Sequence, residues 1–295
     1  MLRFDSATLA GLGAIALWSA LALMTAASGV IPPFQLAAMT FAIGGGLGAA
    51  SWAVRPGAMA ALWQPAPVWL LGIGGLFGYH ALYFAALRLA PPADAGLIAY
   101  LWPLLIVLFS ALLPGEGLRA RHVVGAVAGL AGVVLLVAGK GPGLALEARF
   151  IPGYALALAC AFVWAGYSVL SRGFGSVPTD AVTGFCLATA ALSLACHLAF
   201  ETTVWPQGAT QWLAVLGLGL GPVGAAFYLW DHGVKHGDIR FLGVASYAAP
   251  VLSTLILVSA GYAPATWTLA AAAALIVGGA VCASWDRLRP RQSVT

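Results

Sequence analysis

The chain has 295 residues, of which 62% are hydrophobic and only 7% are charged, with a formal net charge of +4. Soluble domains carry about 25% charged residues, so this composition excludes a water-solvated surface over most of the chain. The bilayer must therefore be the main solvent. In a membrane protein, the distribution of basic residues between the loops is more informative than the net charge.

Apolar windows of about 20 residues, each long enough for a membrane-spanning helix, recur between the charged or proline-rich breaks. In chain order, the ten windows are residues 8–28, 33–54, 67–88, 93–113, 121–139, 152–171, 180–200, 210–231, 239–260 and 265–284. We therefore predict an all-α polytopic membrane protein with ten transmembrane helices.

The distribution of basic residues predicts the orientation, because cytoplasmic loops of membrane proteins are enriched in Lys and Arg. With a cytoplasmic N-terminus, the cytoplasmic loops hold Arg3, Arg55, Arg119, Arg121, Arg172, Lys235, Arg240, Arg287, Arg289 and Arg291. The loops on the other side then hold only Arg88, Lys140 and Arg149. We therefore predict that both termini are cytoplasmic, which requires an even number of spans.

The cysteines do not form a recognisable metal or redox motif. Cys160, Cys186, Cys196 and Cys282 all fall inside predicted spans and lack C-x-x-C spacing, so they are expected to be packing residues. The chain also lacks a Walker motif and a nucleophile with a base at membrane depth. We expect no metal site, no cofactor and no enzymatic activity.

An internal repeat divides the chain into two halves. Trp18, Gly29 and Pro32 recur 146 residues later as Trp164, Gly175 and Pro178, and Gly96, Tyr100 and Pro103 recur 147 residues later as Gly243, Tyr247 and Pro250. Two series at nearly one offset indicate duplication, so we predict five-helix repeats at residues 1–140 and 141–295. Because five is odd, the second repeat must be inverted. Inverted repeats are typical of secondary transporters, whose binding site lies near the midplane between the repeats.

Trp18 and Trp164 lie near the centres of their spans, whereas tryptophans in membrane proteins usually gather at the membrane interfaces. One interpretation is a pair of aromatic walls, between which a planar side chain or an ammonium group binds. The other is a pair of packing residues at the repeat interface. The sequence leaves both interpretations open.

Tyr79, His80 and Tyr83 lie within one turn of the third predicted helix. A histidine inside a span is costly unless it faces water or a partner, which makes His80 a functional candidate. It could bind a carboxylate or carry a coupling proton. The alternative is a neutral ring bonded to a backbone carbonyl or to a tyrosine hydroxyl.

Tyr100 and Pro103 share a stripe of the fourth predicted helix, and Tyr247 and Pro250 repeat the design in the ninth. Proline removes a backbone hydrogen bond and bends a helix, so both prolines are predicted hinges. We predict that both tyrosines line the cavity, although the stripe could instead serve close helix packing. Trp102 points to a different face and is a weaker candidate.

A dense polar group surrounds the predicted turn between the eighth and ninth helices, at residues 231–240. Most of this group is expected to be a solvated cytoplasmic loop. Asp231 and Lys235 are four residues apart and are expected to pair, and a role in a cytoplasmic gate stays open.

These features resemble the drug/metabolite transporter superfamily, with its two EamA-type five-helix repeats, over residues 7–285. A narrower resemblance, to the YddG-type bacterial aromatic amino-acid exporters, rests on Trp18 with Ser19, Tyr79-His80-Ala81-Leu82-Tyr83, Tyr100-Leu101-Trp102-Pro103 and Trp164-Ala165-Gly166-Tyr167. The resemblance implies ten helices, a central cavity and export of amino acids across the bacterial inner membrane.

Other branches of the superfamily move phosphorylated solutes or cationic drugs. Phosphorylated substrates favour buried basic residues, and the sequence has none away from the predicted helix ends. Small multidrug pumps that resemble this superfamily use a carboxylate in the first helix, which here has no Asp or Glu from Ala7 to Ser28.

The expected function is export of aromatic and other neutral amino acids by alternating access, and the alternative is export of other small metabolites or flat cationic drugs. The predicted substrate-binding residues are Trp18, Tyr79, His80, Tyr83, Tyr100, Trp102, Trp164 and Tyr247, and the predicted hinges are Pro103 and Pro250. The expected partners are the amino-acid substrate and the lipid bilayer but no nucleic acid, for a monomer or weak homo-oligomer.

Overall fold

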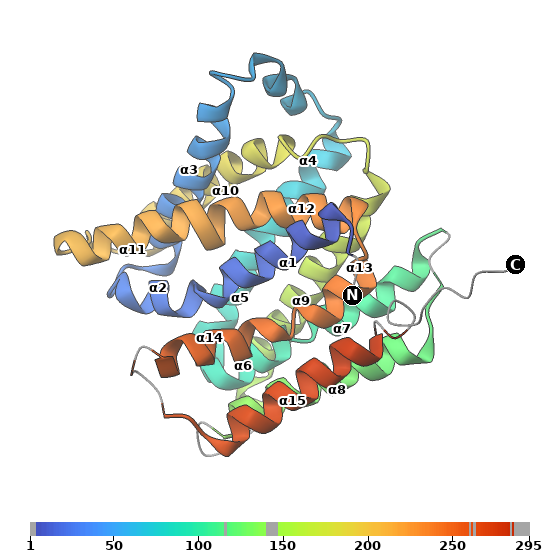
Figure 1. Cartoon of the computed structure of the whole chain (residues 1–295). Coiled ribbons are helices and arrows are strands. Elements are labelled where there is room, and N and C mark those ends of the chain that lie inside the picture. The colour runs from blue at the N-terminus through green and yellow to red at the C-terminus, as the bar shows by residue number, and fades with distance from the viewer. Residues whose placement is uncertain are drawn as a thin grey trace, which may run out of the picture.

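The computed structural model describes residues 4–114, 117–139, 147–259, 261, 264–283 and 285, and every regular element within these ranges is a helix (Figure 1). Nine of the described helices are long and apolar enough to cross a membrane, and Trp267–Ala283 is a shorter apolar helix. These helices fall on the ten windows found in the sequence. The predicted all-α polytopic fold is therefore confirmed.

We number the spans in chain order. In the first half, the first span consists of α1 (Ser6–Ser19) and α2 (Leu21–Ala27), and the second is α3 (Pro33–Ser51). The third span consists of α4 (Ala66–Ile73), η2 (Gly74–Gly78) and α5 (Tyr79–Leu89). The fourth consists of α6 (Pro92–Ala99) and α7 (Trp102–Phe109), and the fifth is α8 (Ala120–Ala138). Short 3₁₀ helices η1 (Pro56–Leu62), η3 (Ser110–Leu112) and η4 (Ala148–Phe150) lie between or at the ends of spans.

The second half follows the same plan. Its spans are α9 (Ile151–Gly173), then α10 (Ala181–Phe200), then α11 (Gly208–Leu220) with η5 (Gly221–Ala225) and α12 (Ala226–His236), then α13 (Ile239–Ala245) with α14 (Ala248–Ser259), and finally α15 (Trp267–Ala283). The eighth span thus continues to His236 instead of ending near residue 231. Asp231 and Lys235 are therefore helical residues, which corrects their placement in a solvated loop.

Interruptions of the spans occur at equivalent places in the two halves. The π-helices η2 and η5 begin 147 residues apart, at Gly74 and Gly221. The fourth span breaks between α6 and α7, just before Pro103, and the ninth breaks between α13 and α14, just before Pro250. The predicted hinge positions therefore coincide with real breaks, while hinge motion itself stays a prediction.

Helix pairing follows the same symmetry. The second span packs on the seventh (α3 on α10) and the fifth on the tenth (α8 on α15), while α1 packs on α12 and α5 on α9 (Figure 1). If each span is replaced by its equivalent in the other half, the pair of the first and eighth spans becomes the pair of the sixth and third. The other two pairs stay the same, so the whole set of contacts is symmetric. Because five consecutive crossings reverse direction, the arrangement is that of two inverted repeats, with the first, third, sixth and eighth spans meeting at its centre.

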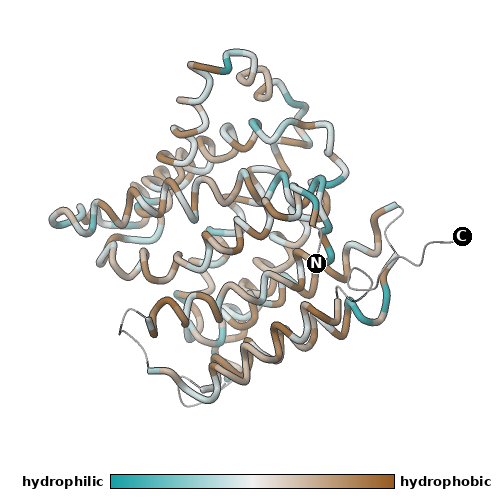
Figure 2. The backbone as a smooth tube through the Cα atoms, in the orientation of Figure 1, coloured by the Kyte–Doolittle hydropathy of each residue, from teal (hydrophilic) through white to brown (hydrophobic). Residues whose placement is uncertain are grey.

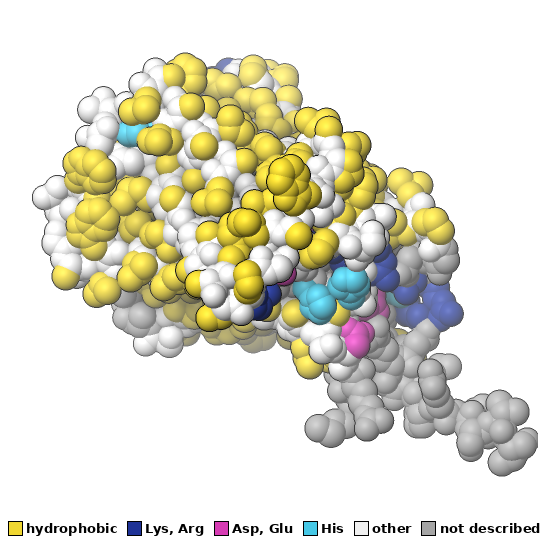
Figure 3. All heavy atoms as spheres, turned by 90° about the horizontal axis from the view of Figure 1, so that it is seen from above, with side chains coloured by type: hydrophobic (Ala, Val, Ile, Leu, Met, Phe, Trp, Pro, Cys, Tyr) yellow, Lys and Arg dark blue, Asp and Glu magenta, His cyan; other side chains and the backbone are white. Residues whose placement is uncertain are grey.

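The outside of the bundle is apolar, as lipid contact requires. Large side chains such as Val30, Leu70 and Leu198 are exposed. Hydropathy along the backbone is high within the helices, and the more hydrophilic stretches lie mainly in the connections (Figure 2). On the face seen in Figure 3, hydrophobic and other uncharged side chains cover most of the surface, whereas most of the visible charged and histidine side chains gather toward one end. On a water-soluble protein, charged side chains would be spread over the surface, and a continuous apolar face of this extent would be unusual.

Some sequence predictions fall on residues for which the structure gives no account. Arg3, Lys140, Arg287, Arg289 and Arg291, used for the orientation, lie outside the described residues, as does the predicted repeat boundary at residues 140 and 141. The cytoplasmic location of both termini stays a prediction.

Candidate functional site

A cavity of about 170 Å³ lies where the two halves meet. Its walls come from six spans, the first, third, fourth, sixth, eighth and ninth, and are formed by Trp18, Leu21, Tyr79, His80, Tyr83, Gly96, Ala99, Tyr100, Trp102, Trp164, Pro222, Val223, Phe227 and Ala249. Seven of the eight predicted binding residues are brought together here. None of these lining residues is Asp, Glu, Lys or Arg, so the cavity is aromatic and formally uncharged unless His80 is protonated.

Trp18 and Trp164 form one continuous aromatic wall. Their ring centroids are 5.8 Å apart and their planes are inclined by 72°, which is an edge-to-face contact. Trp18 Nε1 donates a hydrogen bond to the Pro222 carbonyl at 3.0 Å, which fixes the indole. The two rings thus contact each other and also line the cavity. In this conformation the contacting rings leave no room for a planar group between them, so the packing contact at the repeat interface is present together with a position on the cavity wall.

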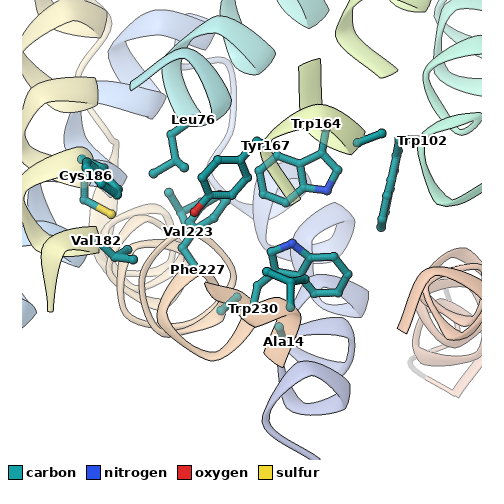
Figure 4. Packing of buried hydrophobic residues seen from close by; sticks show 14 of the residues in the cluster. Ala14, Leu76, Trp102, Trp164, Tyr167, Val182, Cys186, Val223, Phe227 and Trp230 are labelled. Carbon is teal, nitrogen blue, oxygen red and sulfur yellow. The ribbon is translucent and has the colours of Figure 1, made fainter. Parts of the chain in front are cut away.

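Trp102 also belongs to this wall, although its helical position pointed elsewhere. Its ring lies edge-on to both Trp18 and Trp164, with centroids 6.3 Å away in each case. Figure 4 shows Trp102 and Trp164 beside each other in the same aromatic cluster. The cause is the break in the fourth span: Tyr100 and Leu101 leave the helical path, so the side chain at the start of α7 is turned toward the cavity.

Two aromatic residues in the eighth span, Phe227 and Trp230, were missed by the sequence analysis. Phe227 lines the cavity, and Trp230 lies beneath it, with no exposed surface and its indole N–H donating to Ser168 Oγ at 3.0 Å (Figure 4). The signal for both was the repeat, because His80 and Tyr83 shifted by 147 residues fall on these positions. The second half thus supplies Phe227 to the cavity wall and Trp230 to the aromatic cluster behind it.

His80 lies half-buried on the cavity wall, directly after the π-helix η2. Its Nδ1 lies 2.7 Å from the Leu76 carbonyl oxygen. Because a carbonyl only accepts hydrogen bonds, Nδ1 carries the proton, and in the neutral ring Nε2 is then an acceptor. The sequence analysis treated a bond to a backbone carbonyl and a place at the binding site as alternatives for His80. The structure shows that His80 is bonded to the Leu76 carbonyl and also lines the cavity.

Three tyrosines form the polar side of the cavity. The rings of Tyr79 and Tyr83 lie nearly parallel, with centroids 6.0 Å apart and planes inclined by 11°. Tyr79 also contacts Trp164, at a centroid distance of 5.4 Å, so the tyrosine pair and the tryptophan wall adjoin. Tyr100 joins them from the C-terminal end of α6. Their hydroxyls are the hydrogen-bonding groups of an otherwise apolar wall.

Tyr247 lies away from this cavity, contrary to the prediction that it lines it. Its side chain is fully buried against Gly129 of α8, and its hydroxyl accepts a hydrogen bond from the Leu104 N–H at 3.1 Å. In an uninterrupted helix that N–H would bond to the Tyr100 carbonyl, so the break before Pro103 left a donor that Tyr247 satisfies. Tyr247 therefore joins the fourth and ninth spans.

A network of buried hydrogen bonds lies next to Trp230, toward the C-terminal end of α12. Lys235 Nζ lies 2.9 Å from Asp231 Oδ2, and the two side chains are only 3% and 1% exposed. The same ammonium donates to the Val177 carbonyl at 3.1 Å, and the Thr179 hydroxyl donates to Asp231 at 2.8 Å. Arg172 adds hydrogen bonds from the sixth span to carbonyls at the end of α12. These bonds join the eighth span to the sixth span and to the connection that follows it, residues 174–180.

The repeat equivalent of Lys235 at the other end is Arg88, and its surroundings are different. Its side chain is 53% exposed and contacts Glu201 at 3.3 Å. Glu201 also accepts hydrogen bonds from the backbone N–H groups of Phe34 and Gln35 at the start of α3. The equivalent ion pairs at the two ends therefore differ in the burial of the basic side chain, although the carboxylate is buried in both.

Comparisons with known proteins identify the family. The EamA-like transporter family matches residues 6–138 and again residues 151–285. The aromatic amino acid exporter YddG of Ancylobacter novellus is 61% identical over 95% of this chain and 97% of its own length. The protein of the same name in Salmonella typhimurium is 29% identical over 97% of this chain and 99% of its own length.

A solved crystal structure gives an independent comparison. It covers 98% of this chain and 100% of its own, with 59% sequence identity and a TM-score of 0.93. Similarity in sequence and in fold thus extends over both halves. The chain is a multi-pass membrane protein that belongs to the EamA-like transporter family.

Proposed function

We propose that this protein exports aromatic and other neutral amino acids across the bacterial inner membrane by alternating access, with the cavity between the repeats as its binding site. The observation that carries the proposal is a cavity without charged walls, lined by tryptophan and tyrosine, at the junction of two inverted repeats. The name of the 61% identical relative, an aromatic amino acid exporter, supports the same substrate class.

The chemistry of the walls suits a zwitterion with an apolar side chain. Aromatic contacts contribute about 0.5–1.5 kcal/mol each beyond the area that they bury. An ammonium group over a ring face gains about 0.5–2 kcal/mol. The tyrosine hydroxyls can donate to the carboxylate, and Nε2 of a neutral His80 can accept from the ammonium group. A substrate with net charge would lack a counter-charge on these walls.

The second candidate is export of flat cationic drugs or other small metabolites. The aromatic rings of Trp18, Trp102 and Trp164 favour it, since ring faces attract cations. The absence of a carboxylate from the residues lining this cavity counts against it. Phosphorylated solutes fit less well, because arginine or lysine normally binds phosphate and the lining has neither.

We further propose that the protein has no catalytic activity and that the solute passes unchanged, without a cofactor or nucleic acid. The protein would act as a monomer or a weak homo-oligomer. The cavity wall supports transport alone: its only titratable groups are three phenols and one imidazole, and that imidazole is bonded to a backbone carbonyl. Purified protein incubated with phenylalanine should therefore return it chemically intact.

The test is competition in proteoliposomes. Uptake of labelled phenylalanine is challenged in parallel with tryptophan, threonine, lysine, glutamate, a nucleotide sugar and a flat dication. We expect the two neutral amino acids, tryptophan and threonine, to be the only effective competitors, and Tyr100→Ala to weaken their competition. Competition by the dication or the nucleotide sugar alone would contradict the amino-acid assignment and leave only the family-level conclusion.

A further inference from the structure

Gly96 is the glycine among the residues that line the cavity. It lies inside α6, where glycine is a poor helix former and alanine would be preferred. It is not among the described glycines with a positive φ, which are Gly29, Gly208 and Gly261. Backbone conformation therefore gives no reason for a glycine at this position.

Packing gives no reason either. A Cβ placed on Gly96 would meet only the Tyr83 hydroxyl, at 3.7 Å, which is ordinary van der Waals contact. The repeat equivalent, Gly243, is different: its Cβ would lie 3.0 Å from Val107 Cγ2 and 3.2 Å from the Pro103 carbonyl oxygen. Gly243 lets two helices approach closely, whereas the space beside Gly96 belongs to the cavity.

We propose that Gly96 sets the largest substrate side chain that the cavity accepts. This inference rests on the proposed function, and it names the residue that admits large aromatic side chains to the site. The missing side chain leaves room between α6 and the stacked rings of Tyr79 and Tyr83. An aromatic ring lying along these tyrosines uses that room, and a small side chain does not need it.

The other walls cannot retreat to compensate for an added group. Tyr79 is held between Tyr83 and Trp164, Trp18 is fixed by its bond to the Pro222 carbonyl, and Ala99 on the same face of α6 is almost fully buried. Close-packed walls of this kind transmit a change of one methyl group to whatever occupies the cavity. A methyl or isopropyl group at position 96 therefore subtracts directly from the space for the substrate.

The test compares Gly96→Ala and Gly96→Val with the wild type in proteoliposomes, using labelled tryptophan, phenylalanine and threonine. We expect Gly96→Ala to lower tryptophan transport relative to threonine by about tenfold, which is the lower end of the effect of one methylene group on discrimination in an apolar pocket. Gly96→Val should lower the ratio further and should also exclude phenylalanine. The thermal midpoint should be unchanged or higher, since alanine favours helix.

The matched control is Gly46→Ala, the same change at an exposed helical glycine of α3 with no neighbouring atom within 4 Å of the added Cβ. It should leave the ratio of tryptophan to threonine transport unchanged. A second variant, Gly96→Ala combined with Tyr83→Phe, removes the hydroxyl that faces the added methyl and should restore part of that ratio. Threonine transport serves as the internal reference for each protein.

An equal loss of transport for all three amino acids in Gly96→Ala would overturn the inference and assign Gly96 to helix flexibility. An unchanged ratio in both Gly96 variants would also overturn it. Failure of the proposed function is a separate result, because the wild type would then transport none of the three amino acids.

Discussion

The fourth and ninth spans carry the same glycine, tyrosine and proline, and both break before the proline, yet they use these residues differently. Tyr100 faces the cavity, whereas Tyr247 is buried and accepts a hydrogen bond from the fourth span. Duplication therefore preserved the sequence and the break but not the surroundings of the side chain. Under the proposed alternating access the two halves adopt different conformations, so equivalent residues need not have equivalent surroundings.

The same contrast holds at the two ends of the bundle. Lys235 is buried with Asp231, and its equivalent Arg88 is half exposed beside Glu201. Both carboxylates are buried, with Asp231 1% and Glu201 2% exposed, so the difference lies in the basic partner. The Lys235 ammonium has lost its hydration and depends on its partners, whereas the half-exposed Arg88 guanidinium remains solvated and its interaction is screened by water. The stability of the present state should therefore depend far more on one member of each equivalent pair than on the other.

The largest effect is expected from Lys235→Ala. Removing the ammonium leaves the Asp231 carboxylate buried without its counter-charge, which typically costs about 3–5 kcal/mol. Arg88→Ala should cost about 0–1 kcal/mol, because the guanidinium is half exposed and the buried Glu201 carboxylate keeps its two backbone donors at the start of α3 and its contact with His197 Nδ1. Unfolding in detergent measures both. Equal losses of unfolding free energy would contradict the difference between the two ion pairs.

The next effect concerns the tyrosine hydroxyls. Tyr247→Phe leaves the Leu104 N–H without its acceptor in a buried position, which should lower the free energy of unfolding by about 1–3 kcal/mol. Tyr100→Phe should change stability little and weaken phenylalanine binding, since its hydroxyl faces the cavity. Unfolding and uptake are measured on both variants. The comparison of the two tyrosines fails if Tyr100→Phe is the less stable protein.

The smallest effect is expected from a pH gradient. The N–H group at Nδ1 of His80 donates a hydrogen bond to the Leu76 carbonyl. The other residues that line the cavity include no acid or base that titrates near neutral pH. We therefore expect phenylalanine uptake into proteoliposomes to be the same with a pH gradient of either sign. His80→Phe, which copies the equivalent Phe227, should keep this independence. Uptake that follows the gradient in the wild type but not in His80→Phe would identify His80 as a proton carrier.

Much of the fold could be predicted from the sequence. Long apolar windows are required of helices that cross a bilayer, and the duplicated residue series shows directly that the chain has two halves. The end of the eighth span could not, since Asp231 and Lys235 read as loop residues until their burial and mutual contact are known. Likewise, Trp102 and Tyr247 were misplaced because helical periodicity fails across the breaks before Pro103 and Pro250.

Within the candidate site, the third span was the most predictable part, since Tyr79, His80 and Tyr83 stand on an intact turn. The contribution of the eighth span was visible only through the repeat, because Phe227 and Trp230 are ordinary apolar residues by themselves. The direct contact between Trp18 and Trp164 depends on how far apart two helices pack, which no spacing along the chain records.

The central claim, that a neutral amino acid occupies this cavity, is tested most directly by thiol labelling at position 223, a valine of the cavity wall where cysteine takes no space from the substrate. Val223→Cys is made in a background in which the four native cysteines are replaced, with Val54→Cys, at an exposed position beyond the end of α3, as the matched control outside the cavity. Phenylalanine should slow labelling at position 223 and leave position 54 unchanged, while lysine and glutamate should protect neither. Labelling at position 223 that phenylalanine does not slow, in protein that still transports it, would contradict the account.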